Sequence, residues 1–167
     1  MDVLQFNKIF MTTDKRNIRQ KLAKYLGELI SVYHRFRGCD IGRNVRISKS
    51  AILDRSNPKG IHIGNNVRVL IEAMLIAHDY ECEALKGYKM NSDIYIGNNC
   101  VIGGRAMILP GVHIGSNVYV AAGCIVTHSL PCNCMAAGNP ARIIRIGTII
   151  SDNGQILDKG EKVKTKV

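Results

Sequence analysis

The sequence predicts an all-β domain, a parallel β-helix of about four coils, and two recurring patterns predict it. Aliphatic residues recur every six positions, at Ile41, Ile47 and Leu53, at Ile63, Val69 and Leu75, and at Ile96, Ile102, Ile108, Ile114, Val120 and Val126. Four positions after most of these follows a second small or aliphatic residue, at Val45, Ala51, Val67, Ala73, Cys100, Ala106, Val112, Val118, Cys124 and Leu130. A six-residue period fits neither an α-helix nor a simple alternating strand and is typical of hexapeptide solenoids. Three hexapeptides per turn make four coils of 18 residues.

Residues 14–37 predict an amphipathic helix ahead of the repeat. Thr13 or Asp14 can cap it, and its apolar face recurs at spacings of three and four, with Ile18, Leu22, Leu26, Leu29 and Tyr33. The opposite face is basic, with Lys15, Arg16, Arg19, Lys21 and Lys24. We expect the helix to cover the open end of the solenoid, whose strand edges would otherwise be unpaired. Its basic face also suits peripheral contact with a membrane surface.

The repeat is interrupted twice. Ten residues separate Leu53 from Ile63, which indicates a short insertion at 55–60, and 21 separate Leu75 from Ile96, which indicates a larger loop at 78–93. Glycines and asparagines between the aliphatic positions, such as Gly64-Asn65-Asn66, are expected to take the positive φ of sharp turns.

The C-terminal residues predict a hairpin and a charged tail. Ile149-Ile150 and Ile156-Leu157 flank the turn sequence Asp152-Asn153-Gly154, and 159–167 form the tail. We therefore divide the chain into a helical cap (1–38), the repeat with its inserted loop (39–146) and a C-terminal hairpin with tail (147–167).

Composition narrows the class of protein. The 167 residues are 46% hydrophobic, which suits one globular domain. No stretch reaches the roughly 18 apolar residues of a membrane span, and residues 1–13 do not resemble a secretion signal, so a cytoplasmic location is expected. The six cysteines include Cys100 and Cys124 at inward positions, and Cys132 and Cys134 lack the spacing of a zinc pair. Reduced, structural cysteines and no metal are expected.

The charge indicates an anionic partner. The net charge is +10, and the first 46 residues carry ten Lys and Arg against four Asp and Glu. Nucleic acid, a membrane surface and a phosphorylated small molecule all fit this balance. No nucleic-acid motif and no aromatic ladder accompany the charge, so we expect no nucleic-acid partner.

The residues carry a resemblance to a known family. The stretch 94–146, IYIGNNCVIGGRAMILPGVHIGSNVYVAAGCIVTHSLPCNCMAAGNPARIIRI, resembles the C-terminal half of the hexapeptide-repeat acetyltransferases. It is most similar to the maltose, galactoside and nodulation-factor O-acetyltransferases and to the polysaccharide acetyltransferases, and AILDRSNPKGIHIG at 51–64 resembles the same branch. The resemblance covers about residues 39–146. It implies a left-handed β-helix shaped as a triangular prism, a homotrimer, and acetyl-CoA bound in grooves between subunits.

The resemblance also implies roles for individual residues. His78, in LIAHDYE, matches the catalytic histidine, and a histidine suits a general base because its ordinary pKa lies near working pH. Gly104 matches the position whose backbone N–H would stabilise the oxyanion. Ala122 and Thr127 match contacts to coenzyme A, and Arg142 and Arg145 match basic residues near its 3′-phosphate.

The acceptor is a small molecule or glycan that the sequence does not identify. Glu72 stands where the family often has Asn, close to the acceptor, so that its carboxylate would orient His78 or meet a different substrate. The loop residues Tyr80, Glu83 and Tyr88 are further acceptor candidates.

Alternatives on the same fold stay open at this point. Acceptors other than sugars include antibiotics and serine, although serine acetyltransferases have a longer helical N-terminal domain. A γ-type carbonic anhydrase needs three zinc-binding histidines, two of them close in sequence, and the five histidines here include no such pair. A non-enzymatic scaffold subunit is disfavoured by His78 and the two C-terminal arginines.

Overall fold

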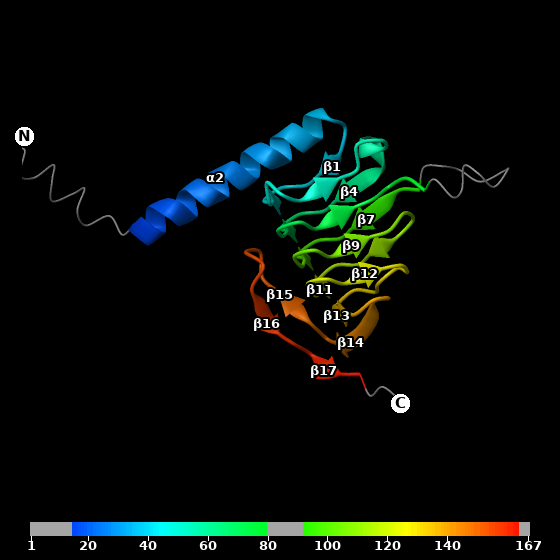
Figure 1. Ribbon diagram of the computed structural model, residues 1–167. Helices are drawn as coiled ribbons and strands as arrows, with labels where there is room; N and C mark the ends of the chain where they lie inside the picture. The colour runs from blue at the N-terminus through cyan, green and yellow to red at the C-terminus, as the bar shows by residue number, and fades with distance from the viewer. Residues whose placement is uncertain (1–14, 80–91, 164–167) are drawn as a thin grey trace, which may run out of the picture.

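The protein is a triangular parallel β-helix with one helix laid across its first coil. The computed structural model describes residues 15–79 and 92–163 (Figure 1). Helix α2 (Lys15–Phe36) precedes four coils of three strands each. The strands are β1 (Asp40–Ile41), β2 (Arg46–Ile47) and β3 (Ile52–Leu53), then β4 (Ile61–Ile63), β5 (Arg68–Val69) and β6 (Met74–Leu75), then β7 (Ile94–Ile96), β8 (Val101–Ile102) and β9 (Met107–Ile108), then β10 (His113–Ile114), β11 (Tyr119–Val120) and β12 (Ile125–Val126).

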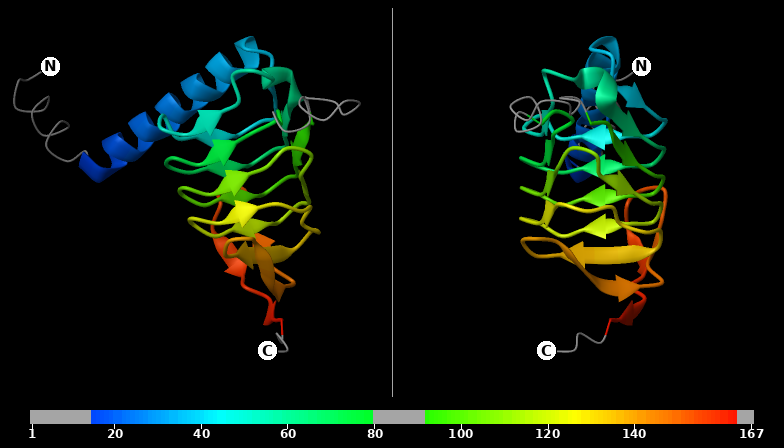
Figure 2. Two further views of the ribbon diagram at one scale, coloured as in Figure 1. Left: turned by 45° about the vertical axis from the view of Figure 1, so that its right-hand side comes forward. Right: turned by 90° about the vertical axis from the view of Figure 1, so that its right-hand side faces the viewer.

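The strands stack into three faces of the prism. Face 1 contains β1, β4, β7 and β10, face 2 contains β2, β5, β8 and β11, and face 3 contains β3, β6, β9 and β12. Neighbouring coils pair in parallel and in step, as Ile41 with Ile63 and Ile63 with Ile96. We name the turns between faces the 1–2, 2–3 and 3–1 corners. The predicted four coils are confirmed, and Figure 2 shows them stacked from the α2 end to the C-terminal end.

The core is a single column inside the prism. All twelve aliphatic residues of the six-residue period are buried, at 7% exposure or less. Of the second set only Ala51 is half-buried. Burial raises the pKa of the Cys100 thiol to about 12, so this residue acts as a small apolar side chain.

The corners correct one expectation about glycine. Asn66 takes positive φ, as predicted, and so do Asn44 and Asn99 at the same 1–2 corner, whereas Asn65 does not. The amides of Asn44, Asn66 and Asn99 form a ladder from coil to coil. Gly64, in the same corner, does not have positive φ. A Cβ there would lie 2.7 Å from the side-chain oxygen of Asn98 in the next coil. Glycine is therefore required for the close approach of successive coils and not for φ.

Helix α2 covers the first coil, but with a face that the pattern did not predict. It packs against β1 and β2, and Figure 1 shows its C-terminal part at the first coil while its N-terminal part slants away from the prism. Gly27, Ser31 and His34 are buried there, whereas Leu26 and Leu29 are about half exposed, at 50% and 49%. The Ser31 hydroxyl donates to the carbonyls of Gly27 and Val45, so the contact favours small and polar residues. Tyr33, also predicted inward, is exposed.

The N-terminal part of the predicted helix lies largely outside the residues that the structure describes. The capping residues Thr13 and Asp14 lie outside the described residues. So do the side chains at 15–24, which include the basic face and the predicted apolar residues Ile18 and Leu22. No helix in the described parts of the chain combines the length and apolar character needed to cross a membrane.

The C-terminal segment continues face 2 and then returns along the prism. Strands β13 (Cys134–Ala137), β14 (Arg142–Ile146) and β17 (Glu161–Lys162) extend the sheet of face 2. The predicted hairpin is confirmed as β15 (Ile149–Ile150) and β16 (Ile156–Asp158), whereas part of the predicted tail forms β17. The carbonyl of Asp152, in the hairpin turn, accepts hydrogen bonds from Asn44 (3.0 Å) and Arg68 (2.8 Å). The hairpin therefore ties the C-terminal segment to the first two coils.

Candidate functional site

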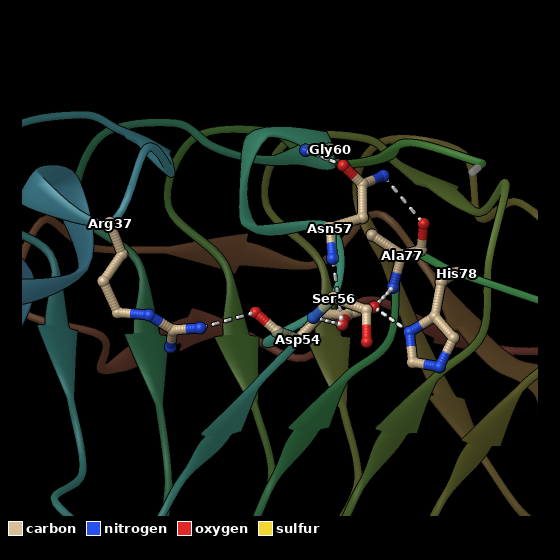
Figure 3. A network of polar contacts seen from close by, with 7 residues as sticks. All are labelled: Arg37, Asp54, Ser56, Asn57, Gly60, Ala77 and His78. Carbon is tan, nitrogen blue, oxygen red and sulfur yellow. Dashed lines mark hydrogen bonds and ion pairs between the residues drawn. The ribbon is translucent and has the colours of Figure 1, made fainter.

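His78 and Asp54 form a pair at the 3–1 corner. His78 lies three residues after β6, where the longer insertion begins, and Asp54 directly follows β3, where the shorter one begins. The His78 Nδ1 lies 2.5 Å from the Asp54 Oδ2 (Figure 3). The Asp54 side chain is fully buried, and that of His78 is 19% exposed. The pair thus combines a hidden carboxylate with an imidazole that reaches the surface.

The shorter insertion holds the carboxylate in place. The backbone N–H groups of Ser56 (2.8 Å) and Asn57 (3.3 Å) donate to Asp54 Oδ1, and that of Ala77 (2.7 Å) donates to Oδ2. The Asn57 amide also donates to the carbonyl of Ala77 at 2.9 Å. This insertion, which includes the short 3₁₀ helix η1 (Pro58–Gly60), therefore connects Asp54 to the backbone just before His78.

These contacts keep Asp54 ionised. Burial is the largest influence and raises its pKa, but hydrogen bonds from His78 and from the N–H groups of Ala77, Ser56 and Asn57 together hold the pKa below its ordinary value. An ionised carboxylate only accepts hydrogen bonds, so the Nδ1 of a neutral His78 carries the proton. Nε2 is then the basic nitrogen of the ring.

Sequence reasoning missed Asp54 and considered Glu72 in its place. Glu72 lies at the 2–3 corner, where its Oε2 accepts from Arg105 Nε at 2.7 Å. In this chain Asp54, and not Glu72, orients His78. The signal was present in the repeat: Leu53 pairs with Leu75, so the two insertions that follow them leave the same corner in successive coils.

A second group of predicted residues lies along the 2–3 corner. Gly104 and Ala122 occupy this corner in the third and fourth coils, where the carbonyl of Gly104 accepts from the N–H of Gly123 at 2.9 Å. The chain reaches the same corner once more between β13 and β14, and Arg142 opens β14 with an exposed side chain. Gly104, Ala122 and Arg142 therefore follow one another along one corner.

The other two residues predicted to bind coenzyme A, Arg145 and Thr127, have different surroundings. Arg145 is half-buried, and its Nη1 donates to the carbonyl of Gly160 at 2.9 Å, which supports the segment before β17. Thr127 follows β12 at the 3–1 corner, where its hydroxyl lies 2.8 Å from Nδ1 of His128. The acceptor candidates Tyr80, Glu83 and Tyr88 lie outside the described residues.

One chain does not bring His78 and Gly104 together. They occupy the 3–1 and 2–3 corners, at opposite ends of the strands of face 3. A single site that uses both therefore needs two copies of the chain. Within the described ranges, no three His, Cys, Asp or Glu side chains are placed to hold a metal ion.

The family comparison matches the repeat. Residues 93–128 match the family described as bacterial transferase hexapeptide (six repeats). A putative acetyltransferase of Saccharomyces cerevisiae, YJL218W, is 36% identical over 64% of this chain and 58% of its own length. Galactoside O-acetyltransferase of Escherichia coli is 42% identical over 51% of this chain and 43% of its own length. The chain thus matches about half the length of these curated relatives.

Solved structures share the fold. The hexapeptide-repeat acetyltransferase VCA0836 of Vibrio cholerae, in complex with acetyl-CoA, is similar with a TM-score of 0.57 and 26% identity, over 65% of this chain and 60% of that one. Serine acetyltransferase of Brucella abortus is similar with a TM-score of 0.53 and 25% identity, over 64% and 40%. The prism is the expected left-handed parallel β-helix.

Proposed function

We propose that this chain, a hexapeptide-repeat protein with the fold of known acetyltransferases, is itself an acetyl-CoA-dependent O-acetyltransferase. The observation that carries the proposal is the His78–Asp54 pair at the repeat's larger interruption. A buried carboxylate that fixes the tautomer of a partly exposed histidine suits that histidine for general-base catalysis. The acetyl-CoA complex of the Vibrio relative supports the donor.

In the proposed reaction, His78 Nε2 accepts the proton of an acceptor hydroxyl while that oxygen attacks the thioester carbonyl. The backbone N–H of Gly104 donates to the tetrahedral oxyanion. When the intermediate collapses and the C–S bond breaks, protonated His78 gives the proton to the departing thiolate, which leaves as the free thiol of coenzyme A. Asp54 keeps the ring oriented and stabilises the imidazolium.

We assign two copies to each site, in a homotrimer. His78 and Gly104 lie at different corners of one prism, so His78 of one subunit would meet Gly104 of its neighbour. The 2–3 corner with Gly104, Ala122 and Arg142 would hold coenzyme A, with Arg142 near the 3′-phosphate.

We propose a hydroxyl of a sugar or of a surface-polysaccharide precursor as the acceptor. The E. coli relative, a galactoside O-acetyltransferase by name, supports a sugar. Serine is the second candidate, favoured by the shared fold of the Brucella enzyme.

An acceptor screen tests the function. Free thiol released from acetyl-CoA is measured with nucleotide sugars, lipid-linked glycans, simple glycosides and serine. We expect one acceptor class to support turnover that His78→Ala lowers by about 10²- to 10⁴-fold. His113→Ala, which alters an imidazole outside the dyad, is the matched control. Near-normal turnover of His78→Ala would exclude the assigned base.

A further inference from the structure

A groove of about 560 Å³ lies between α2 and face 2. Its walls are largely apolar, with Leu26 and Ile30 from the helix and Leu70 and Ile71 from the second coil. Leu70 and Ile71 are 40% and 58% exposed, so this apolar surface remains accessible in the single chain. A groove of this kind suits a chain-like apolar ligand or a protein partner.

Two arginines beneath this groove have unsatisfied donors. Arg46 and Arg68 both line it and lie side by side, since they are paired residues of β2 and β5. The Nε atoms of both are buried and have no hydrogen-bond partner in the described parts of the chain. Arg68 is only 6% exposed, and its Nη atoms donate to the backbone carbonyls of Asn44, Val67 and Asp152.

Within the described ranges, neither guanidinium has a carboxylate as ion-pair partner. Among the described residues no ion pair involves Arg46 or Arg68, and Lys49 adds a third cation to the lining. Burial, and then the neighbouring charge of Arg46, lowers the pKa of Arg68. Adjacent, partly desolvated like charges are unfavourable, and a bound anion that accepts from both would relieve this.

The groove reaches the corner proposed for acyl transfer. Ile71 lines the groove at the 2–3 corner, where a Cβ on Gly104 would lie 3.1 Å from the Ile71 side chain. A ligand that contacts Ile71 would therefore lie close to Gly104. The apolar walls select a hydrocarbon chain, and the arginine pair selects an anion.

We propose that this groove binds a phosphorylated amphiphile, with its phosphate at Arg46 and Arg68 and its apolar chain along α2. The idea that this ligand is the lipid-phosphate part of an acyl acceptor rests on the proposed function. The idea that the groove binds such a ligand does not. The phosphate and the chain together distinguish such an acceptor from a free sugar. The other occupant of an apolar groove, a second copy of this chain, would cover the apolar walls but would supply no phosphate to the two adjacent arginines.

Binding is tested on the full chain without acetyl-CoA, by calorimetry below the critical micelle concentration. The probes are dodecyl phosphate, dodecyl maltoside and inorganic phosphate. We expect dodecyl phosphate to bind at least about tenfold more tightly than either of the others. Arg46→Gln should weaken dodecyl phosphate about tenfold and leave dodecyl maltoside unchanged. Arg43→Gln removes an exposed arginine of the same coil that does not line the groove and should change neither.

The apolar wall has its own matched pair. Leu26→Asn should weaken both dodecyl probes, whereas Leu29→Asn, on the same helix but outside the groove, should not. Equal affinity for the phosphate and maltoside probes, or equal losses in Arg46→Gln and Arg43→Gln, would overturn the proposal. So would absence of dodecyl phosphate binding together with dissociation of the oligomer in Leu26→Asn, which would identify a second copy as the occupant.

The same variants separate this inference from the proposed function. Thiol release is measured with a water-soluble acceptor, for which Arg46→Gln should behave as the unaltered chain. Dodecyl phosphate binding without any acyl transfer would support the groove assignment and refute the transferase function. Acyl transfer without dodecyl phosphate binding would support the transferase function and refute the groove assignment.

Discussion

The Nδ1 of His78 lies 2.5 Å from a fully buried oxygen of Asp54, 24 residues earlier in the chain. The two residues open the two interruptions of the hexapeptide repeat, at one corner in successive coils. Backbone N–H groups of the shorter interruption hold the carboxylate of Asp54. That carboxylate orients the imidazole of His78 at the start of the longer interruption.

Asp54→Asn should lower kcat by about 10² or more in a chain that stays folded at neutral pH. The amide no longer stabilises the imidazolium and can favour the wrong tautomer of His78. The measurement is thiol release from acetyl-CoA, with circular dichroism as the folding check. Asp40→Asn, on face 1 and exposed, is the control. A loss in Asp54→Asn no larger than in the control would contradict a positioning role.

The same carboxylate makes stability depend on pH. Its pKa in the folded protein lies below the ordinary value of 3.8, so ionised Asp54 stabilises the fold above about pH 4. This stabilisation is lost as the pH falls through the folded-state pKa. In urea unfolding at pH 6 and pH 3, the free energy of unfolding should fall less for Asp54→Asn than for Asp40→Asn. Parallel losses in both variants would show that Asp54 is not the group responsible.

Mixed assemblies should reveal whether a site spans two subunits. His78→Ala and Gly104→Leu should each be inactive alone, the latter because a larger side chain would meet Ile71. When the two are refolded together in equal amounts, about one quarter of the sites in a random trimer would combine an intact His78 with an intact Gly104. Recovery of activity checks this, and its absence in verified mixed trimers would place the whole site in one chain.

Substitution of Arg142 should weaken binding of the acetyl donor, whereas substitution of Arg145 should lower the stability of the fold. Arg142→Gln should raise KM for acetyl-CoA about tenfold, because one charge-assisted contact to the 3′-phosphate is removed. With 3′-dephospho-acetyl-CoA, KM should be the same for Arg142→Gln and for the unaltered chain. Arg145→Gln should mainly lower the melting temperature, since its guanidinium holds the Gly160 carbonyl. Steady-state kinetics with both donors and thermal unfolding provide the measurements. A penalty for Arg142→Gln that is the same with both donors would remove it from the 3′-phosphate.

Gly64→Ala should destabilise the prism more than Gly123→Asn. A Cβ at residue 64 would lie 2.7 Å from Asn98 of the next coil, and overpacking of this kind costs about 1–3 kcal/mol. Gly123 has a φ of +68° and open space around it, and Asn tolerates that conformation. Urea unfolding of the two variants compares them directly. A larger loss for Gly123→Asn would mean that φ, and not coil spacing, selects these glycines.

The sequence by itself determined the prism and its core. The six-residue period is a local pattern, and each aliphatic residue such as Ile102 or Val120 faces inward because every hexapeptide forms the same strand and turn. The position of His78 at an interruption followed from the same count. The C-terminal hairpin was predicted from its turn residues, which also act locally.

Only the tertiary structure decided which residues meet across coils. Asp54 reaches His78 because two insertions leave one corner in successive coils. Arg46 and Arg68 become neighbours only because β2 pairs with β5. Leu26, Leu29 and Tyr33 of α2 were wrongly predicted to face inward. Gly27 lies against Arg46 in their place, and the Ser31 hydroxyl donates to the carbonyl of Val45. Sequence spacing records contacts within a repeat, whereas contacts between coils depend on how the turns are stacked.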